Sequence, residues 1–375
     1  MKIALVSPYD FAYPGGVVNH ISCLEQHLTA GGHEVYIIAP ASKAVTRFGN
    51  RFLAVGRPRS IPASGSVARI TISPMISREI KPILQREKFD VIHLHEPLMP
   101  MLCTNILRHS TQPCVGTFHA SGGKPWYNFG SPIAKYFMNK WMDKLDVKIA
   151  VSETAKEYIQ RFFDEEYTVV PNGIDTTHFN PDVAPMEKYQ DNKINILFVG
   201  RLEKRKGLDY LLDAYKMIKP EFPDTRLIVV GPGIRLRNKY MKRVAEAGLQ
   251  DVEFVGYADY DDLPRYYKSA DIVCAPATGW ESFGIVLLEA MAVSAALVAS
   301  NIDGYSRVIE QGVDGLLVPP KDGGGMAEAL RTLIIDSELR QRLGEAGRKK
   351  SVEYDWSKIT KKVIDCYTQS INHRK

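Results

Sequence analysis

Short apolar runs with the character of strands alternate with helical stretches along most of the chain, and this alternation limits the fold more than any other feature. Residues 3–6 and 35–39 are two such runs. Between them Ile21, Leu24 and Leu28 recur at helical spacing. The order strand, helix, strand is typical of parallel sheets that carry helices on both faces. The sequence therefore predicts an α/β protein with mostly parallel, doubly wound sheets.

The alternation occurs in two series. In the first, we expect further strands at 90–95, 113–118, 147–151 and 168–170 and a helix at 152–163. In the second, we expect strands at 194–199, 226–230, 252–255, 271–275, 296–300 and 315–318, with helices at 208–218, 240–247, 262–269, 282–292 and 325–335. Two series in 375 residues favour two domains, because one core rarely serves so long a chain.

We expect the first domain at residues 1–174 and the second at 194–354. Residues 175–193 are poor in apolar side chains and contain several breaks, so they are predicted to link the two. Residues 355–375 contain a long amphipathic helix, which either closes the second domain or crosses back to the first.

Several classes of protein are disfavoured by composition. No apolar run is long enough to span a membrane as a helix, and the first residues resemble a strand more than a signal peptide. The cysteines are odd in number and scattered, which favours reduced thiols in a cytoplasmic protein and no structural metal. They are Cys23, Cys103, Cys114, Cys274 and Cys366.

The charge is unevenly distributed. Residues 1–150 hold 17 Lys and Arg against 9 Asp and Glu, whereas the remainder holds 31 against 34. Residues 123–145 also interleave lysines with aromatic side chains. A basic first half suits an anionic partner such as a lipid surface. The same aromatic residues could equally be core, and we leave both interpretations open here.

The segment ESFGIVLLEAM, residues 281–291, carries two acids eight residues apart, Glu281 and Glu289. Ser282 is predicted to cap the helix that follows, which would place Glu281 beside backbone N–H groups able to hold a polar ligand. Taken alone, the segment is equally well explained as an ordinary capped helix with Glu289 on a solvated face.

A second motif, VGRLEKRKG at residues 199–207, crowds Arg201, Lys204, Arg205 and Lys206 into a loop after a strand. Cations packed this closely repel one another unless an anion lies between them. A diphosphate site is therefore favoured over a solvated basic loop.

Two weaker signals lie in the first domain. Gly15 and Gly16 form a glycine turn before a helix, where a phosphate or sugar can approach the backbone closely. His119 follows the run PCVGTF, at the strand end where ligands gather in such sheets. The acids of Asp259-Tyr260-Asp261 resemble a metal motif, but capping of the next helix explains them. We expect no bound metal.

Together these motifs resemble the retaining glycosyltransferases of family four, which have the GT-B fold of two Rossmann-like domains facing a central cleft. The resemblance covers essentially the whole chain. The runs SPYDFAYPGGVVNH, SGSVARI, GTFHAS and CAPATGWESFGIVLLEAM look closest to the bacterial phosphatidylinositol alpha-mannosyltransferases of that family.

The resemblance implies roles for individual residues. His119, Glu281, Arg201 and Lys206 would be catalytic. The donor, a nucleotide sugar, would contact Gly15, Gly16, Arg201, Arg205, Lys206, Ala258, Glu281, Ser282, Phe283, Gly284, Ile285 and Glu289. The acceptor would contact Tyr9, Arg69 and Lys124, with Val18 at a position where the group tends to carry a polar residue.

The resemblance further implies mannose transfer from GDP-mannose to phosphatidylinositol at the cytoplasmic face of the membrane. The protein would be peripheral and would need no cofactor and no nucleic acid. Three alternatives remain open at this point: a family-four enzyme with another donor, such as UDP-glucose, or another acceptor; a nucleotide-sugar epimerase; and a non-catalytic binding protein.

Overall fold

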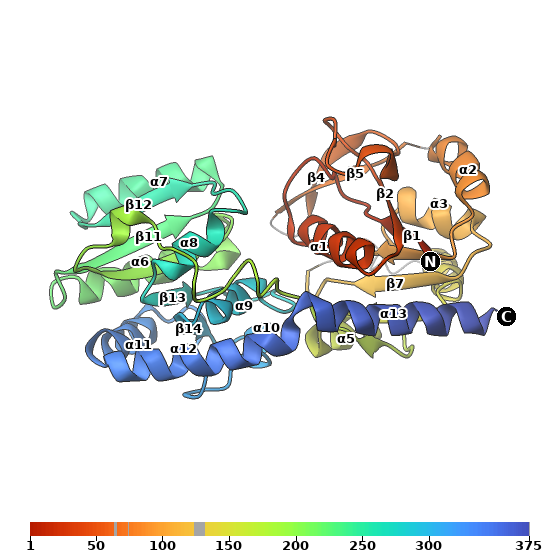
Figure 1. The fold of residues 1–375 in the computed structure, drawn as a ribbon. Helices are drawn as coiled ribbons and strands as arrows, with labels where there is room; N and C mark the ends of the chain where they lie inside the picture. Colours follow the sequence, from red (N-terminus) through yellow and green to blue (C-terminus); the bar gives the residue numbers. More distant parts are fainter. Residues whose placement is uncertain (64–65, 74, 124–131, 375) are drawn as a thin grey trace. The chain divides into compact units, whose positions relative to one another are not determined.

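The computed structural model describes residues 1–63, 66–73, 75–123 and 132–374. The chain divides into two compact units, each of which is described by itself (Figure 1). The first comprises Met1–Gly173 and Trp356–Lys375, and the second comprises Ile174–Asp355.

The first unit is built on a parallel sheet in the strand order β3-β2-β1-β6-β7-β8-β9. Its strands are β1 (Lys2–Val6), β2 (Glu34–Ala39), β3 (Phe52–Ala54), β6 (Val91–His95), β7 (Cys114–Phe118), β8 (Val147–Ala150) and β9 (Thr168–Val169). Its helices are α1 (Gly16–Ala30), α2 (Ile76–Glu87), α3 (Leu102–His109), α4 (Pro132–Met142), α5 (Glu153–Gln160) and α13 (Trp356–His373). The strands β4 (Pro58–Ala63) and β5 (Ser66–Thr71) form a separate antiparallel pair.

The second unit repeats the plan with the strand order β12-β11-β10-β13-β14-β15, again parallel. Its strands are β10 (Ile194–Val199), β11 (Thr225–Val230), β12 (Val252–Gly256), β13 (Ile272–Ala275), β14 (Ala296–Ser300) and β15 (Leu316–Val318). Its helices are α6 (Leu208–Ile218), α7 (Ile234–Glu246), α8 (Leu263–Lys268), α9 (Ile285–Ala292), α10 (Asp303–Ser306), α11 (Gly323–Ile335) and α12 (Ser337–Ser351).

Central strands of both sheets are covered on both faces, as expected of parallel sheets flanked by helices. Every residue of β6 is buried, including His93 and His95, and every residue of β14 is buried too. Helix α1 buries Val18, Ile21, Leu24 and Leu28 at helical spacing. The apolar periodicity in the sequence is thus the packing pattern of the core.

The C-terminal helix α13 packs in the first unit, where it contacts α1 and lies beside β7 (Figure 1). Trp356 at its start is buried, and its ring packs against the rings of His20 and His27 of α1. Farther along, the Tyr367 hydroxyl is 2.8 Å from Nδ1 of His93. The helix therefore completes the core of the first unit and does not close the second.

The segment predicted as a linker, residues 175–193, requires a correction. It belongs to the second unit, and Phe179 and Tyr189 are buried in a core cluster of that unit. The low content of apolar residues suggested a linker, but the side chains of Phe179 and Tyr189 are enough to anchor the segment in the core of the second unit. The sequence prediction also lacked the β4–β5 pair, the short helix α10 and helix α12, which begins where the Asp336 carboxylate accepts the Leu339 N–H at 2.8 Å.

The junction before α13 gives a stability prediction. A methyl group on Gly173 would lie 2.4 Å from Cδ2 of Trp356, so Gly173→Ala should overpack the core and cost about 1–3 kcal/mol. Gly16→Ala is the control, because a methyl group there meets no atom within 4 Å and should change stability by less than about 0.5 kcal/mol. Urea unfolding measures both, and equal stability of the two variants would contradict the packing described for Trp356.

Candidate functional site

In the second unit, candidate residues gather at the carboxyl ends of two neighbouring strands. The basic loop follows β10 and contains a short 3₁₀ turn, Lys204–Lys206. The loop that carries Glu281 follows β13, which pairs with β10 in parallel. Because parallel strands end at the same edge of a sheet, the two motifs meet although they lie about 75 residues apart in sequence.

The Glu281 carboxylate is held by two cations of the basic loop. Its Oε1 is 2.7 Å from Nζ of Lys206 and also accepts a hydrogen bond from Nη1 of Arg205. The three side chains are largely shielded from solvent, which strengthens their attraction relative to a surface pair. The structure thus joins the acid predicted for the sugar to the cations predicted for the diphosphate.

Glu203 is a residue that sequence reasoning missed. Its carboxylate lies 2.9 Å from Nε of Arg205 and 3.1 Å from Nη2 of Arg201. Glu203 and Glu281 therefore supply the negative charge that a crowded basic loop requires. Nothing in the spacing VGRLEKRKG distinguished Glu203 from a solvated acid.

The expected cap of α9 is wrong. The helix begins at Ile285 and its N-cap is Gly284, with no side-chain hydrogen bond at the cap. Gly284 has a φ of +87°, and a Cβ there would lie 2.5 Å from Cε1 of Tyr305, so only glycine fits. Ser282 and Glu281 precede the helix, and Glu281 is neutralised by side-chain cations.

Glu289 lies inside α9 and is buried, which corrects the idea of a solvated face. The Tyr267 hydroxyl donates a hydrogen bond of 2.6 Å to its Oε2. Burial raises the pKa of Glu289 to about 7, and the bond from Tyr267 and the charge of Lys206 oppose that shift. A buried acid that titrates near neutrality is typical of binding and catalytic sites. Sequence reasoning missed Tyr267.

Three other donor candidates in the second unit serve the packing. Phe283 is buried, and its ring lies edge-on to that of Tyr354 at 5.5 Å between centroids. Ile285 and Ala258 are partly buried against the same core cluster. Their side chains are therefore structural, which leaves their backbone groups for a ligand.

In the first unit, His119 follows β7 and is fixed by two residues at the carboxyl end of β6. Its backbone N–H donates to Oε1 of Glu96 at 2.8 Å, and the N–H of Ala120 donates to the same oxygen at 3.0 Å. Its Nε2 is 3.0 Å from Nδ1 of the fully buried His95. Glu96 and His95 orient His119, and neither was predicted to do so. Burial raises the pKa of Glu96 to about 7.

Helix α1 contributes a further histidine, His20, beside His119. The rings of His20 and His119 are 4.9 Å apart between centroids, and Nδ1 of His20 is 2.9 Å from Oδ1 of Asn172. Gly16 lies one helical turn before His20, on the same face of α1. Neither Gly15 nor Gly16 would bring a Cβ within 4 Å of another atom, so the backbone there is open to a ligand.

The imidazoles of this cluster are neutral. Burial lowers the pKa of His20 to about 4 and that of His93 to about 3, and it holds the pKa values of His95 and His119 well below their usual range. A neutral His119 offers one donor and one acceptor nitrogen. It can therefore hydrogen-bond a sugar hydroxyl without bringing a charge.

The same histidines form a group that could hold a metal ion, since one nitrogen each of His20, His95 and His119 lies within 4.8 Å of the others. Metal-bound histidines usually donate their second N–H to an acceptor. Asn172 serves His20 in this way, but Nε2 of His95 is buried and, within the described residues, has no hydrogen-bond partner. The group fits a hydrogen-bonded cluster better than a metal site.

The acceptor candidates of the first unit differ in their surroundings. The Asp10 N–H donates to the Arg69 carbonyl at 2.8 Å, which brings Tyr9 beside β5, and the Arg69 guanidinium stacks 3.4 Å above the Tyr13 ring. Val18 is buried in the core, so its side chain is part of the packing. Lys124 lies outside the described residues.

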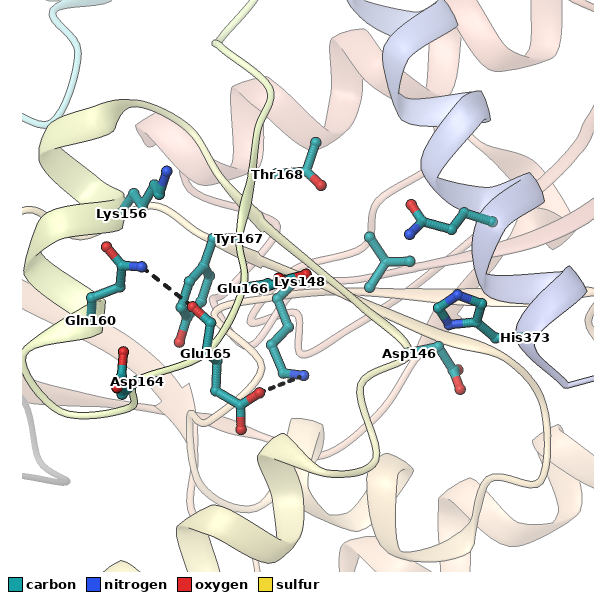
Figure 2. Close-up of a pocket in the computed structure, with 12 residues that line it drawn as sticks. Asp146, Lys148, Lys156, Gln160, Asp164, Glu165, Glu166, Tyr167, Thr168 and His373 are labelled. Atoms are coloured by element: carbon teal, nitrogen blue, oxygen red, sulfur yellow. Dashed lines mark hydrogen bonds and ion pairs between the residues drawn. The ribbon is translucent and has the colours of Figure 1, made fainter.

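A cavity of about 760 Å³ in the first unit lies at the opposite edge of the sheet (Figure 2). Asp146, on its wall, precedes β8, whereas His119 follows β7. Lys148 reaches Glu165 across it at 3.3 Å, and the remaining lining is mostly polar or charged. None of the candidate donor or acceptor residues lines this cavity.

Comparison with known proteins agrees with the geometry. Residues 14–178 match the family model described as Glycosyltransferase Family 4, and residues 184–350 match the model described as Glycosyl transferases group 1. Both units thus carry the signature of a glycosyltransferase. The chain belongs to the family-four glycosyltransferases, and the predicted family, fold class and enzymatic nature are confirmed.

Individual proteins similar to this chain include one sequence relative and two solved structures. The chain is 35% identical to the phosphatidyl-myo-inositol mannosyltransferase of Mycolicibacterium smegmatis, over 98% of this chain and 93% of the relative. Among solved structures it is similar to sucrose-phosphate synthase from Thermosynechococcus elongatus, with a TM-score of 0.80, 22% identity and 98% of each chain covered. It is also similar to Anabaena HepE in complex with UDP and glucose, with a TM-score of 0.76, 19% identity, and 97% of this chain and 98% of HepE covered.

No helix within the described residues combines the length and the apolar character that crossing a bilayer requires.

The Tyr267–Glu289 pair gives a pH-dependent prediction. Tyr267→Phe removes the hydroxyl that donates to the Glu289 carboxylate, and an unsatisfied buried group costs about 1–3 kcal/mol. The folded-state pKa of Glu289, about 7, lies above its ordinary value of 4.5. The group is therefore protonated at pH 5 and ionised at pH 8, and the loss of stability should be larger at pH 8.

Denaturant unfolding at the two pH values measures this difference. Tyr215→Phe is the matched control, because the buried Tyr215 hydroxyl donates to the backbone carbonyl of Thr225 at 3.0 Å and its loss should cost the same at both pH values. Adding Glu289→Gln to Tyr267→Phe should abolish the pH difference. A pH-independent loss in Tyr267→Phe would contradict the assignment.

Proposed function

We propose that this enzyme transfers mannose, with retention of configuration and without a metal ion, from GDP-mannose to the inositol of phosphatidylinositol at the cytoplasmic face of a membrane. The observation that carries the proposal is the Glu281 carboxylate held between Arg205 and Lys206 at the carboxyl end of the second sheet. The identity of 35% to a phosphatidyl-myo-inositol mannosyltransferase, over 98% of this chain, supports mannose as the transferred sugar and phosphatidylinositol as the acceptor.

The basic loop would stabilise the leaving group. As the bond from the anomeric carbon to the diphosphate breaks, negative charge grows on the leaving oxygen. Arg201, Arg205 and Lys206 can each bond such an oxygen, and a hydrogen bond to a charged group contributes about 1.5–3 kcal/mol. Side-chain cations can thus supply the stabilisation that a metal ion can give to a departing diphosphate.

The acceptor hydroxyl would form the new bond to the anomeric carbon and give its proton to the leaving phosphate oxygen. No separate general base is then required. Glu281 would leave its cations when the diphosphate arrives and bind hydroxyls of the sugar. Glu289, whose pKa burial raises to about 7 and whose carboxylate Tyr267 holds, would bind the ribose, and the neutral His119 would hydrogen-bond the transferred sugar.

The acceptor would be recognised by the first unit. Tyr9 and Arg69 are tied together through the Asp10–Arg69 backbone hydrogen bond of 2.8 Å, and Arg69 carries the positive charge that a lipid phosphate requires. Lys124 is proposed on the family resemblance alone.

Three variants test the chemistry. Glu281→Gln, Lys206→Ala and His119→Ala should each lower kcat with GDP-mannose and phosphatidylinositol, and Lys206→Ala should do so by about 10- to 100-fold because it loses one charged hydrogen bond. Lys242→Ala on α7 is the control, since Lys242 is exposed and pairs only weakly with Glu246 at 3.6 Å. Product formation by mass spectrometry gives the rates.

Rates near that of the wild type in all three variants would overturn the assignment. Turnover with UDP-glucose but not with GDP-mannose would show that the donor is UDP-glucose and not GDP-mannose. Epimerised nucleotide sugar without any transfer product, or binding without turnover, would indicate the epimerase or the binding protein instead.

A membrane contact is proposed for the exposed face of α4. Tyr136 and Phe137 are 57% and 50% exposed, and the Lys140 ammonium lies 4.5 Å from the centre of the Tyr136 ring. Met138 and Met142 on the other face are buried. The helix thus pairs a packed face with an aromatic and basic one, as peripheral membrane helices do. Exposed basic residues of α2, among them Arg78 and Lys81, add charge on the same unit.

Vesicle binding tests this surface. Lys135→Ala combined with Lys140→Ala should weaken co-sedimentation with anionic vesicles, because each lysine near the surface contributes about 1 kcal/mol, or about fivefold in affinity. Tyr136→Ser with Phe137→Ser should weaken it further. Met217→Ser removes an equally exposed apolar side chain from α6 and is the control. If the wild type does not bind anionic vesicles at low salt, the proposed membrane contact of α4 is wrong.

A further inference from the structure

Trp280, directly before Glu281, combines two unfavourable features. The residue is 60% exposed, although tryptophan has the largest apolar side chain. Its backbone has a φ of +59°, in the left-handed region. Of the non-glycine residues with positive φ in the described parts of the chain, Trp280 is the only aromatic one. A bulky residue in this conformation is an outlier that requires a reason.

The conformation has no support from burial. A strained residue persists only where the surrounding structure holds it, and packing of its side chain is one way to do so. Here the indole is mostly in solvent, so substitution by glycine would remove both the strain and the exposed apolar surface. Stability therefore gives no reason for tryptophan at this position, which leaves contact with a ligand.

The turn that carries Trp280 is held firmly on both sides. Before it, the Thr278 N–H donates to the Arg205 carbonyl at 2.8 Å. After it, the Glu281 side chain is bound by Arg205 and Lys206, and the Glu281 carbonyl oxygen lies only 1.9 Å from where a Cβ on Gly304 would be. The indole is thus presented from a fixed support beside the basic loop.

We propose that the Trp280 indole is a platform on which the pyranose ring of the donor stacks, and that it helps to select the sugar. The inference rests on the proposed function and adds to it a residue with no part in the phosphate contacts. A pyranose ring exposes C–H groups on its faces and hydroxyls at its edge. Trp280 would contact one face, while the adjacent Glu281 would bind the hydroxyls at the edge.

Selection follows from the shape of the sugar. An axial hydroxyl on the stacked face would hold the ring away from the indole, whereas an equatorial one would not. Epimers that differ at one carbon therefore contact Trp280 differently, although their edges offer Glu281 the same chemical groups. The platform would thus distinguish sugars that the carboxylate alone cannot.

The test compares ligands with and without the sugar. Isothermal titration of Trp280→Gly should show an unchanged Kd for GDP and a Kd for GDP-mannose raised about two- to tenfold, the range expected for the loss of one aromatic contact. Trp280→Phe should restore most of the affinity. The same comparison with UDP and UDP-glucose covers the alternative donor.

Strain relief is measured separately. Lys321→Gly is the matched control, because Lys321 is exposed and has a φ of +65°. Both glycine variants should unfold at the temperature of the wild type or above it, and only Trp280→Gly should raise the KM of the donor, with kcat at saturating donor little changed.

The outcomes separate the two proposals. If the wild type binds a nucleotide sugar and Trp280→Gly binds it equally well, the platform is overturned and the proposed function stands. If the Trp280 effect occurs with UDP-glucose alone, the platform stands and the proposed donor fails. If Trp280→Gly loses vesicle binding while sugar affinity is kept, the indole contacts lipid and the platform is overturned. Binding of neither nucleotide sugar by the wild type overturns both.

Discussion

The ion cluster around Glu281 is the interaction on which the site of the second unit depends. A loop with Arg201, Lys204, Arg205 and Lys206 in six residues would repel itself without nearby negative charge. Glu203 and Glu281 provide that charge from the loop itself and from the neighbouring strand end. The cluster therefore keeps the cations together, and in the proposed function its carboxylate would become available when the diphosphate of the donor replaces it.

The fold was largely predictable from the sequence because parallel strands buried on both faces leave a strong apolar signal. Residues 194–199 and 296–300 were predicted with the bounds that the structure has. Features that depend on contacts far apart in sequence were not predictable. Phe179 and Tyr189 turn the expected linker into part of the second unit, and the place of α13 depends on the fit of Trp356 against Gly173.

The candidate site was predictable in part. The sequence singled out the basic loop and the spacing of Glu281 and Glu289, the family resemblance implied roles for the two acids, and the structure brings Glu281 and the loop together. The sequence could not indicate the residues that hydrogen-bond to these candidates. Nothing in it marks Tyr267 as the donor to Glu289 or Glu96 as the acceptor for the His119 loop. Such partners become visible only when the chain is folded, because a hydrogen bond within a core leaves no periodic signal.

The return of α13 to the first unit has a consequence for the order in which the chain matures. The residues that complete the first core lie on both sides of the segment Ile174–Asp355. A ribosome adding about 5–20 residues per second needs about 10–40 s to make that segment. During this time the surface around His27 and Gly173 that Trp356 will cover is without its partner. The second unit is thus complete before the first, although the first begins to be made earlier.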